Sequence, residues 1–448
     1  MHPKIQFPTG NPLSDIIGDY TASSQIIKPA VKKDLKVLSL FTGAGGMDIG
    51  FEGDFICHER SIAPNLPWIA SSLNDNWVKV LPTRFQIIFA NDILEGARKS
   101  WWQYMNRYIS REDIYQLESI VDLVKQHQRG EKVFPDQVDV VIGGFPCQDF
   151  SVAGKRKGFT SNRGHDGKLH SPIDLPTEET RGMLYYWMRE VISITKPKIF
   201  IAENVKGLVN FKDVKDIIQL DFARSDGDGY IVLPPRVLHA GAYGVPESRE
   251  RVFFVGIRRS DLTPQALCAL EQEETPLLYD PYPSPTHGSP CHSGLPLEPF
   301  VTCQEIFANL KEPNVSSDLS QQIYSRAKYM GSHCQGQKEI DLRGLAPTIR
   351  SEHHGNIEYR RLSVEHGGSY LEELELGLEE RRLTPRECAL IQTFPPDYPF
   401  VSRASSPRRK FDVSSSMAYK VIGNAVPPVL AYHIAQRLQE LWDVYFKK

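Results

Sequence analysis

The 448-residue sequence lacks several features that define whole classes of protein. No apolar run approaches the roughly 18 to 20 residues that cross a bilayer, and no apolar block follows a basic start within residues 1–30. We therefore expect no membrane span and no secretory signal. An excess of one charge is also lacking, because 52 Lys and Arg face 55 Asp and Glu, for a net charge of −3. This balance excludes a wholly basic polypeptide, but it allows a basic groove on a near-neutral body.

Cysteine is scarce, with seven residues scattered along the chain and no Cys-x-x-Cys pair. An odd number at wide spacing is typical of reduced thiols in a cytoplasmic protein. We therefore expect a cytoplasmic location and no metal site. One of the seven can still be a nucleophile, which composition alone does not identify.

Short apolar runs alternate with helical patterns along the first 258 residues. Runs typical of strands covered on both faces occur at 37–41, 85–90, 138–144, 198–202, 236–240 and 251–257. Helical periodicity marks 183–194, which Pro197 ends, and 429–446. This alternation predicts an α/β fold with a doubly wound, mostly parallel sheet. Residues 53–83 are interpreted as an insertion that packs through its tryptophans.

The character of the chain changes near residue 259. Residues 260–380 are rich in Pro, Gly, Ser and His and lack long periodic runs. We interpret residues 259–399 as a second, smaller and irregular domain. Residues 1–258 and 400–448 then form the sheet domain.

A glycine-rich turn, Phe41-x-Gly43-x-Gly45-Gly46, follows the first strand and opens a helix. Glycines let a ligand approach the backbone, and a helix N-terminus offers free N–H groups. Asp92, at the end of the next sheet strand, suits ribose hydroxyls. A nicotinamide, a flavin and S-adenosylmethionine all fit this pattern, and a plain tight turn is an equal alternative.

Two further strands end in reactive residues. Cys147 lies in Gly144–Ser151, where polar and Pro neighbours favour a crevice over a buried core. A free thiol with a pKa near 8.5 is only a few per cent thiolate at neutral pH. Nearby cations or a helix N-terminus must therefore lower the pKa of Cys147. Glu203-Asn204-Val205 ends the strand at 198–202. A lone Glu there is more often a structural ion-pair partner, but two strand ends together indicate a site.

Several charged segments admit both a structural and a functional reading. Arg249 and Arg251 lie two apart at the start of a strand and form either a solvated pair or a cationic clamp. Gly423–Pro428 starts the last helix. Basic residues also cluster at 155–157 and 403–410, as solvated loops or as phosphate contacts.

Taken in order, these segments resemble the C5-cytosine-specific DNA methyltransferase family of bacterial restriction–modification systems. Six sequence motifs, in this order along the chain, carry the resemblance. They are Phe41–Gly46, Gly144–Ser151 with its Pro-Cys-Gln core, Glu203–Val205, Glu247–Arg251, Arg382–Glu387 with Gln392-x-Phe394-Pro395, and Gly423–Pro428. The resemblance implies a Rossmann-like methyltransferase domain, with residues 259–399 as its target-recognition domain.

The resemblance also implies a chemistry. The thiolate of Cys147 would attack C6 of a flipped-out cytosine, while neutral Glu203 protonates N3. C5 would then accept the methyl group of S-adenosyl-L-methionine. Arg251 would hold the cytosine O2, Asn204 would shape the pocket, and Arg249 would join Arg251 in the clamp.

The remaining site residues follow from the same resemblance. The cofactor would be lined by Phe41, Gly43, Gly45, Gly46, Asp92, Ile93, Pro146, Asn424 and Val426. DNA would be contacted by Gln148, Ser151, Lys155 and Arg156. The implied partner is double-stranded DNA, and the implied protein is a monomer that works alongside a cognate restriction endonuclease without binding it.

Two positions depart from the family pattern. The Gln that opens the Gln-x-Arg-x-Arg motif is Glu247 here, which leaves its role open. No clear Gly-Asp-Ile segment supplies the adenine ligand, which leaves Ser119, Ile120 and Asp122 as alternatives.

Other functions fit less of the sequence. A tRNA cytosine-5 methyltransferase shares the chemistry, but the large recognition segment favours DNA. A nicotinamide oxidoreductase leaves the Cys147, Glu203 and Arg251 segments unexplained. A catalytically dead DNA-binding homologue is disfavoured by the same three residues.

Overall fold

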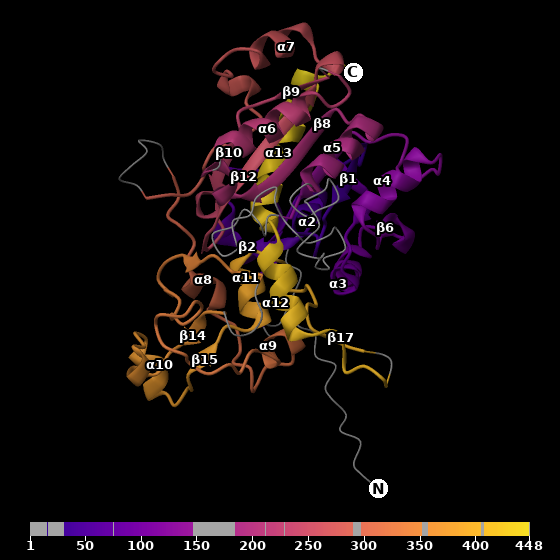
Figure 1. Ribbon diagram of the computed structural model, residues 1–448. Helices are drawn as coiled ribbons and strands as arrows, with labels where there is room; N and C mark the ends of the chain where they lie inside the picture. Colours follow the sequence, from indigo (N-terminus) through magenta and orange to yellow (C-terminus); the bar gives the residue numbers. More distant parts are fainter. Residues whose placement is uncertain are drawn as a thin grey trace.

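The structure is a computed structural model of the whole chain. It describes Ile16 and residues 31–74, 76–146, 184–210, 212–227, 229–289, 297–351, 357–404 and 407–447. Its centre is a sheet of eight strands in the order β10-β12-β8-β7-β1-β5-β6, with β9 also paired to β12. Helices cover both faces of this sheet, and a more irregular part lies below it (Figure 1).

The predicted mostly parallel sheet is confirmed. β1 (Leu35–Leu40), β5 (Phe85–Asn91), β6 (Tyr115–Gln116), β7 (Val140–Gly144) and β8 (Ile199–Val205) run parallel. β12 (Glu250–Arg258) runs antiparallel to β8, and β9 (Tyr230–Val232) and β10 (Arg236–His239) run antiparallel to β12. The carboxyl ends of four long strands and the amino end of β12 therefore meet at one edge.

Alternate residues of the strands enter two separate apolar cores. Val37, Ile142 and Ile201 face the core shared with α2 (Gly46–Glu52), α3 (Glu95–Met105) and α13 (Pro428–Tyr445). Leu38, Val141 and Phe200 face the core shared with α4 (Ile120–Gln128), α5 (Leu184–Thr195) and α6 (Lys212–Ala223). This double coverage explains why the strands read as continuous apolar runs.

The last helix and the predicted insertion pack together. α13 begins at Pro428, where a fixed φ and a missing N–H suit the first turn. Residues 53–83 form a three-stranded sheet of β2 (Ile56–His58), β4 (Trp77–Val80) and β3 (Ile69–Ser72). Trp68 of this insertion meets Tyr432 and His433 of α13 edge-on. The helix is therefore buried on more sides than a single stripe predicts.

The irregular part consists of short elements. They are α8 (Cys303–Phe307), α9 (Leu319–Gln322), β13 (Ala346–Pro347), β14 (Tyr359–Arg361), α10 (Leu371–Glu375), β15 (Arg381–Arg382) and α11 (Pro385–Ile391). β16 (Ser402–Arg403), β17 (Phe411–Val413) and α12 (Ser415–Asn424) lead back to α13.

The division at residues 259 and 400 stays a prediction, and the packing crosses it at several points, two of which are α7 (Pro264–Leu270) and Tyr398. α7 lies in the predicted second domain but contacts α13. Tyr398 lies in the same range, yet its hydroxyl donates to the carbonyl of Ala44 at 2.9 Å. One of the two apolar cores, the one that contains Val37 and Ile142, thus includes residues of both predicted parts.

Candidate functional site

The site is built where the strands end. β1 leads into Phe41, β5 into Asp92, β7 into Phe145, and β8 ends at Glu203–Val205. β12 runs the other way, so Arg251 lies near its beginning at the same edge. Four parallel strands and one antiparallel strand therefore bring these separate segments to one edge of the sheet, the edge at which open α/β sheets bind ligands.

The glycine-rich turn uses its glycines for different purposes. Gly43 has a φ of +57°, and a Cβ built there would meet no atom within 4 Å. Gly45 has a φ of +77°, and its Cβ would lie 2.7 Å from the Trp101 ring. A Cβ on Gly46 would lie 2.2 Å from the Val426 carbonyl oxygen. Gly43 thus faces open space, while Gly45 and Gly46 admit the packing of α3 and the entry to α13.

A buried carboxyl that the sequence analysis missed supports this turn. Asp48, in α2, accepts hydrogen bonds from Ser39 Oγ at 2.6 Å and from Trp101 Nε1 at 2.6 Å. Thr42 Oγ1 donates to it at 3.2 Å. Burial raises the pKa of Asp48 to about 6, against these three donors. The sequence signal that points to Asp48 is an Asp in the first turn of a helix that follows a glycine-rich turn.

Asp92 closes the turn from the neighbouring strand. Its Oδ2 accepts the Gly43 N–H at 3.0 Å, and its Oδ1 accepts the Leu94 N–H at 2.9 Å. Burial raises the pKa of this carboxyl, while the backbone donors act against that shift. Ile93, the next residue, leaves 45% of its surface exposed. A carboxylate and an exposed apolar side chain thus lie side by side at the end of β5.

The end of β6 gives one further apolar side chain to this region. Leu117 is 40% exposed directly after β6, which pairs with β5. Asn91 Nδ2 donates to the carbonyls of Gln116 and Glu118 and fixes this chain end. Of the predicted adenine ligands, Ser119 caps α4 and Ile120 is buried in the core. Asp122 lies in the first turn of α4.

The ends of β8 and β12 hold a carboxyl and a guanidinium. Glu203 Oε1 lies 3.1 Å from Arg251 Nε, with both side chains nearly buried. Burial raises the pKa of the Glu203 carboxyl, against the lowering effect of Arg251 and then Arg249. Register pairs Glu203 with Gly144 across β7 and β8. A Cβ on Gly144 would lie 2.6 Å from Glu203 Oε2, so the carboxylate occupies the space that this glycine leaves.

Asn204 fixes the backbone that follows β7. Its Nδ2 donates to the Phe145 carbonyl at 3.1 Å, and its own Oδ1 accepts the Val205 N–H at 2.9 Å. Pro146 is half-buried beside this contact. Cys147, Gln148, Ser151, Lys155 and Arg156 lie outside the described residues.

Arg249 is not part of the clamp that the sequence predicts. Its guanidinium is fully buried and donates to the carbonyls of Ile349, Gly423 and Ala425 at 3.1, 2.9 and 2.8 Å. The strand breaks between β11 (Glu247–Ser248) and β12, so positions 249 and 251 no longer share one face. Arg249 is therefore a positioning residue that ties the chain at Ile349 to the end of α12.

Glu247 takes part in the same junction. Its Oε1 accepts the Ile349 N–H at 2.6 Å and lies 3.6 Å from Arg249 Nη1. Its Oε2 is buried without a hydrogen-bond partner among the described residues. Burial raises the pKa of Glu247, with Arg249 opposing the shift. The Glu247 side chain is close in size to the glutamine that the family pattern has at this position.

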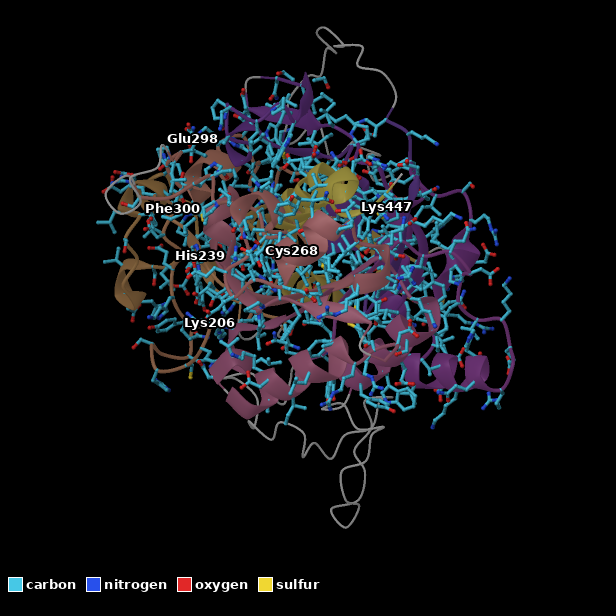
Figure 2. All side chains as sticks on the ribbon, turned by 90° about the horizontal axis from the view of Figure 1, so that it is seen from above. Lys206, His239, Cys268, Glu298, Phe300 and Lys447 are labelled. Carbon is cyan, nitrogen blue, oxygen red and sulfur yellow. The ribbon has the colours of Figure 1, made fainter. Side chains whose placement is uncertain are left out.

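The rim of the site is polar. Lys206 Nζ lies 2.7 Å from Glu250 Oε1, directly beside Arg251 in sequence. His239 Nε2 lies 3.3 Å from Ser248 Oγ, and its ring meets Phe300 edge-on. Figure 2 shows Lys206, His239 and Phe300 along one side of the molecule. Asn424 is exposed at the end of α12, and Val426 is buried against Gly46.

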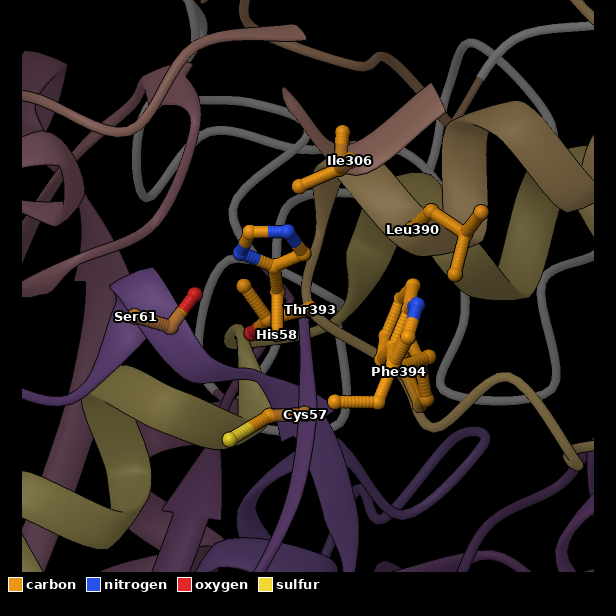
Figure 3. Close-up of a pocket in the computed structure, with 8 residues that line it drawn as sticks. Cys57, His58, Ser61, Ile306, Leu390, Thr393 and Phe394 are labelled. Carbon is orange, nitrogen blue, oxygen red and sulfur yellow. The ribbon is translucent and has the colours of Figure 1, made fainter. Parts of the chain in front are cut away.

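A separate apolar pocket lies between the 53–83 insertion and residues of α8 and α11 (Figure 3). Cys57, His58 and Ile306 are among its lining residues, and none of the candidate site residues lines it. Burial lowers the pKa of His58 to about 4, so the imidazole is neutral.

In the described ranges, no group of three His, Cys, Asp or Glu is arranged to hold a metal ion. Nor does any helix within those ranges have the length and apolarity to cross a membrane.

Comparisons with known proteins agree with this geometry. A family model described as C-5 cytosine-specific DNA methylase matches residues 35–440. The chain therefore belongs to this family and is a DNA (cytosine-5-)-methyltransferase, as the resemblance predicts.

Individual relatives cover most of the chain. Type II methyltransferase M.NgoFVII of Neisseria gonorrhoeae is 27% identical over 427 residues, which are 92% of this chain and 88% of that protein. M.BspRI of Lysinibacillus sphaericus is 29% identical over 445 residues, or 95% and 87%. The crystal structure of a Spodoptera frugiperda DNMT2 mutant has a TM-score of 0.50 at 17% identity, covers 91% and 100% of the two chains, and shares the fold.

Proposed function

We propose that this methyltransferase transfers the methyl group of S-adenosyl-L-methionine to C5 of a flipped-out cytosine in a specific double-stranded DNA sequence. The observation that carries the proposal is the Glu203–Arg251 pair, held 3.1 Å apart at the end of β8, where Glu203 pairs with Gly144 of β7. Cys147 follows Gly144 by three residues in the sequence. An acid, a cation and a nucleophile then surround one base. The stacked duplex hides C6 from any thiol, so the cytosine must leave the helix.

The residues at the ends of β1 and β5 suit S-adenosylmethionine, which supplies an electrophilic methyl group when bound. The open space over Gly43 admits a ligand against the backbone. Asp92 follows β5 and accepts the Gly43 N–H, and we assign its carboxylate to the ribose hydroxyls. Exposed Ile93 would offer an apolar surface for the adenine. The other residues that we assign to the lining of the cofactor site are Phe41, Gly45, Gly46, Pro146, Asn424 and Val426.

The chain's own groups carry the covalent steps. The Cys147 sulfur forms a bond to C6, and the electrons of the C5–C6 double bond move toward C5. Protonated Glu203 donates its proton to N3, which prevents charge from building up on the ring. A carboxyl whose pKa is raised by burial suits this role. After methylation, water accepts the C5 proton, the C5–C6 double bond re-forms as the S–C6 bond breaks and releases the Cys147 thiolate, and the N3 proton returns to Glu203.

Arg251 and Asn204 hold the reacting groups in place. The guanidinium of Arg251 contacts Glu203, and we assign to it a hydrogen bond to the cytosine O2. Asn204 fixes the Phe145 carbonyl, two residues before Cys147. We assign DNA contacts to Gln148, Ser151, Lys155 and Arg156, because their segment follows the nucleophile and is basic.

We further propose that the enzyme protects host DNA in a restriction–modification system. The support is the similarity to relatives named type II methyltransferases. It would act in the cytoplasm as a monomer, alongside an endonuclease that cuts the same sequence and does not bind to it.

A trapping experiment tests this function. Wild-type enzyme, S-adenosylmethionine and duplex DNA containing 5-fluorocytosine should form a covalent complex, because fluorine cannot leave C5 as a proton does. Cys147→Ala should form no adduct and transfer no methyl group while still binding the cofactor. Glu203→Gln should be severely impaired in turnover. Normal turnover by Cys147→Ala would contradict the mechanism.

A further inference from the structure

We call residues 259–399, the expected target-recognition domain, the recognition segment. Its loop at residues 328–336 presents an unusual set of side chains. Met330 is 63% exposed, and Ser332, His333 and Gln335 are also exposed. The loop turns at Gly331, whose φ is +96°, and a Cβ there would lie 2.8 Å from the His333 ring. One apolar and three hydrogen-bonding side chains thus project from a tight turn.

A buried arginine holds the neck of this loop. Arg382 donates from Nε to the Ala327 carbonyl at 2.8 Å, from Nη2 to the Lys328 carbonyl at 3.2 Å and from Nη1 to the Gly336 carbonyl at 2.7 Å. Its guanidinium therefore joins the two ends of the loop. Lysine has no planar fork of donors and cannot replace these bonds together.

A second buried side chain closes the loop from within. Gln337 Oε1 accepts the Met330 N–H at 2.9 Å, and its Nε2 donates to the Gln335 carbonyl at 3.3 Å. With Arg382, this amide fixes the backbone on both sides of the exposed turn. A loop ordered before binding loses less conformational entropy when it meets a ligand.

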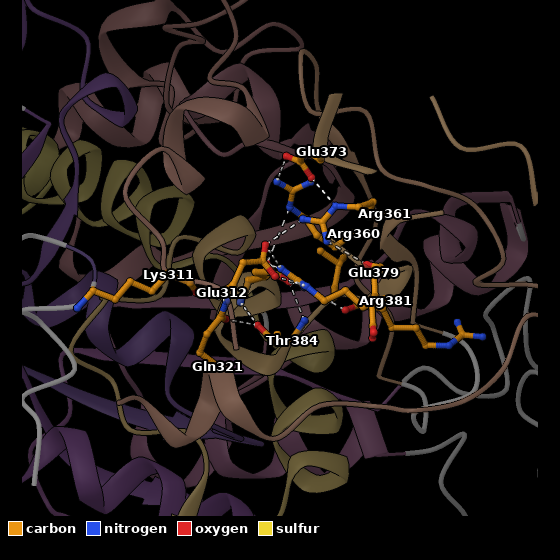
Figure 4. Close-up of polar contacts among 12 residues, drawn as sticks. Lys311, Glu312, Gln321, Arg360, Arg361, Glu373, Glu379, Arg381 and Thr384 are labelled. Carbon is orange, nitrogen blue, oxygen red and sulfur yellow. Dashed lines mark hydrogen bonds and ion pairs between the residues drawn. The ribbon is translucent and has the colours of Figure 1, made fainter. Parts of the chain in front are cut away.

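The base of the loop is equally well held. Arg381, beside Arg382, pairs with Glu312 and Glu387 at 3.0 and 2.8 Å. Arg361 pairs with the same Glu312 at 2.9 Å (Figure 4). These nearly buried ion pairs attach the segment to α11, whose capping box uses Thr384 and Glu387. The loop thus projects from a rigid support.

The charge around the loop fits a polyanion. Residues 319–338 contain no Asp or Glu, and their three cations Arg326, Lys328 and Lys338 are exposed. None of these three forms an ion pair with another residue that the structure describes. Residues 363–380 of the same segment are the opposite, with six Glu and no Lys or Arg. Only the first surface is suited to phosphates.

We propose that the 328–336 loop is the part of the recognition segment that reads the DNA sequence. Ser332, His333 and Gln335 would hydrogen-bond to base edges, and Met330 would pack against a base. The flanking cations would hold phosphates and set the register. Arg382 and Gln337 are positioning residues for this loop. The inference rests on the proposed function, because it assumes a specific duplex target.

The test uses the full-length enzyme, S-adenosylmethionine and a pool of unmethylated duplexes of random sequence. Bisulfite sequencing reports which cytosines are methylated and in what context. His333→Ala and Gln335→Ala should each reduce methylation of the preferred sequence roughly ten- to hundred-fold, or relax the preference at one position. Arg382→Lys should weaken the preference without changing cofactor binding. Glu372→Ala and Leu376→Ser, on the acidic surface, are matched controls and should behave as wild type.

Each outcome separates the inference from the proposed function. If wild-type enzyme methylates no duplex in the pool, the proposed function fails. If it methylates one sequence and both loop variants keep its rate and context, the inference is wrong. Equal loss in the loop variants and in the acidic-surface controls would also overturn it. A changed preference in the loop variants alone supports it.

Discussion

Glu203 occupies the space that Gly144 leaves empty: a methyl group on Gly144 would lie 2.6 Å from Glu203 Oε2. Gly144→Ala should therefore displace the carboxylate, which is the movable end of a side chain, and leave the strands paired. Misplacement of a reacting group by about 1 Å can reduce a rate about 100-fold. We expect single-turnover methyl transfer to fall at least roughly ten-fold, measured with saturating S-adenosylmethionine and duplex DNA.

Two measurements keep this prediction specific. Cofactor affinity by calorimetry should match wild type, because Gly43 and Asp92 lie at other strand ends. The midpoint of thermal unfolding should also change little. A variant with normal turnover would show that the Glu203 carboxyl does not need this position.

Glu247 gives a pH-dependent prediction. Its pKa is raised above the ordinary value of 4.5 by burial. Below that value the carboxyl is protonated in both the folded and the unfolded state, and folding pays no penalty. As the pH rises, the unfolded state loses its proton first, so the free energy of unfolding falls until the folded pKa is passed. Glu247→Gln removes the titrating group and keeps the acceptor for the Ile349 N–H.

The variant should therefore unfold at a higher temperature than wild type at pH 8, and this difference should shrink toward pH 4.5. Thermal unfolding across this pH range measures it. Glu365→Gln, at an exposed position, is the control and should show no such trend. A Gln variant that is less stable at every pH would mean that the charge pairing with Arg249 dominates.

The sequence predicts the strand ends well because local pattern and topology agree there. Apolar runs of five to seven residues, each followed by a polar motif, are enough to place Glu203 and Asp92 at one edge. The alternation rule fails at Arg249, because it holds only within an unbroken strand and β11 ends before β12 begins.

Long-range packing explains the other gaps. The acceptor role of Asp48 depends on Trp101, which is 53 residues away. The fixed neck of the 328–336 loop depends on Arg382, 54 residues from Lys328. Neither contact leaves a periodic signal. Family resemblance locates Arg382 within a motif, but the partners of its guanidinium emerge only from the fold.

Asp92 connects the end of β5 to the glycine-rich turn, so we expect it to govern cofactor affinity. In Asp92→Asn, one of the two acceptor oxygens becomes an NH₂ group. The side chain then keeps a single acceptor oxygen and loses either the Gly43 or the Leu94 N–H bond. The turn should loosen and the ribose acceptor should be lost. We expect the dissociation constant for S-adenosylmethionine to rise roughly ten-fold or more by calorimetry, given about 1–3 kcal/mol for a disrupted buried acceptor. Unchanged affinity would remove Asp92 from the cofactor site, and Asp113→Asn, on the exposed surface, is the control.

His433 makes the junction between α13 and the insertion sensitive to acid. Burial, followed by the charge of His287, lowers its pKa to about 3 from 6.5. Trp68 and Tyr243 contact the ring edge-on. The unfolded state takes up a proton below pH 6.5 and the folded state does not, so stability falls from there toward pH 3. One histidine contributes a slope of at most about 1.4 kcal/mol per pH unit.

His433→Phe keeps the ring contacts and cannot be protonated, so its free energy of unfolding from urea titrations should decline less steeply between pH 6.5 and 5. His333→Phe, at an exposed position, should keep the wild-type slope, and equal slopes for all three proteins would contradict this assignment.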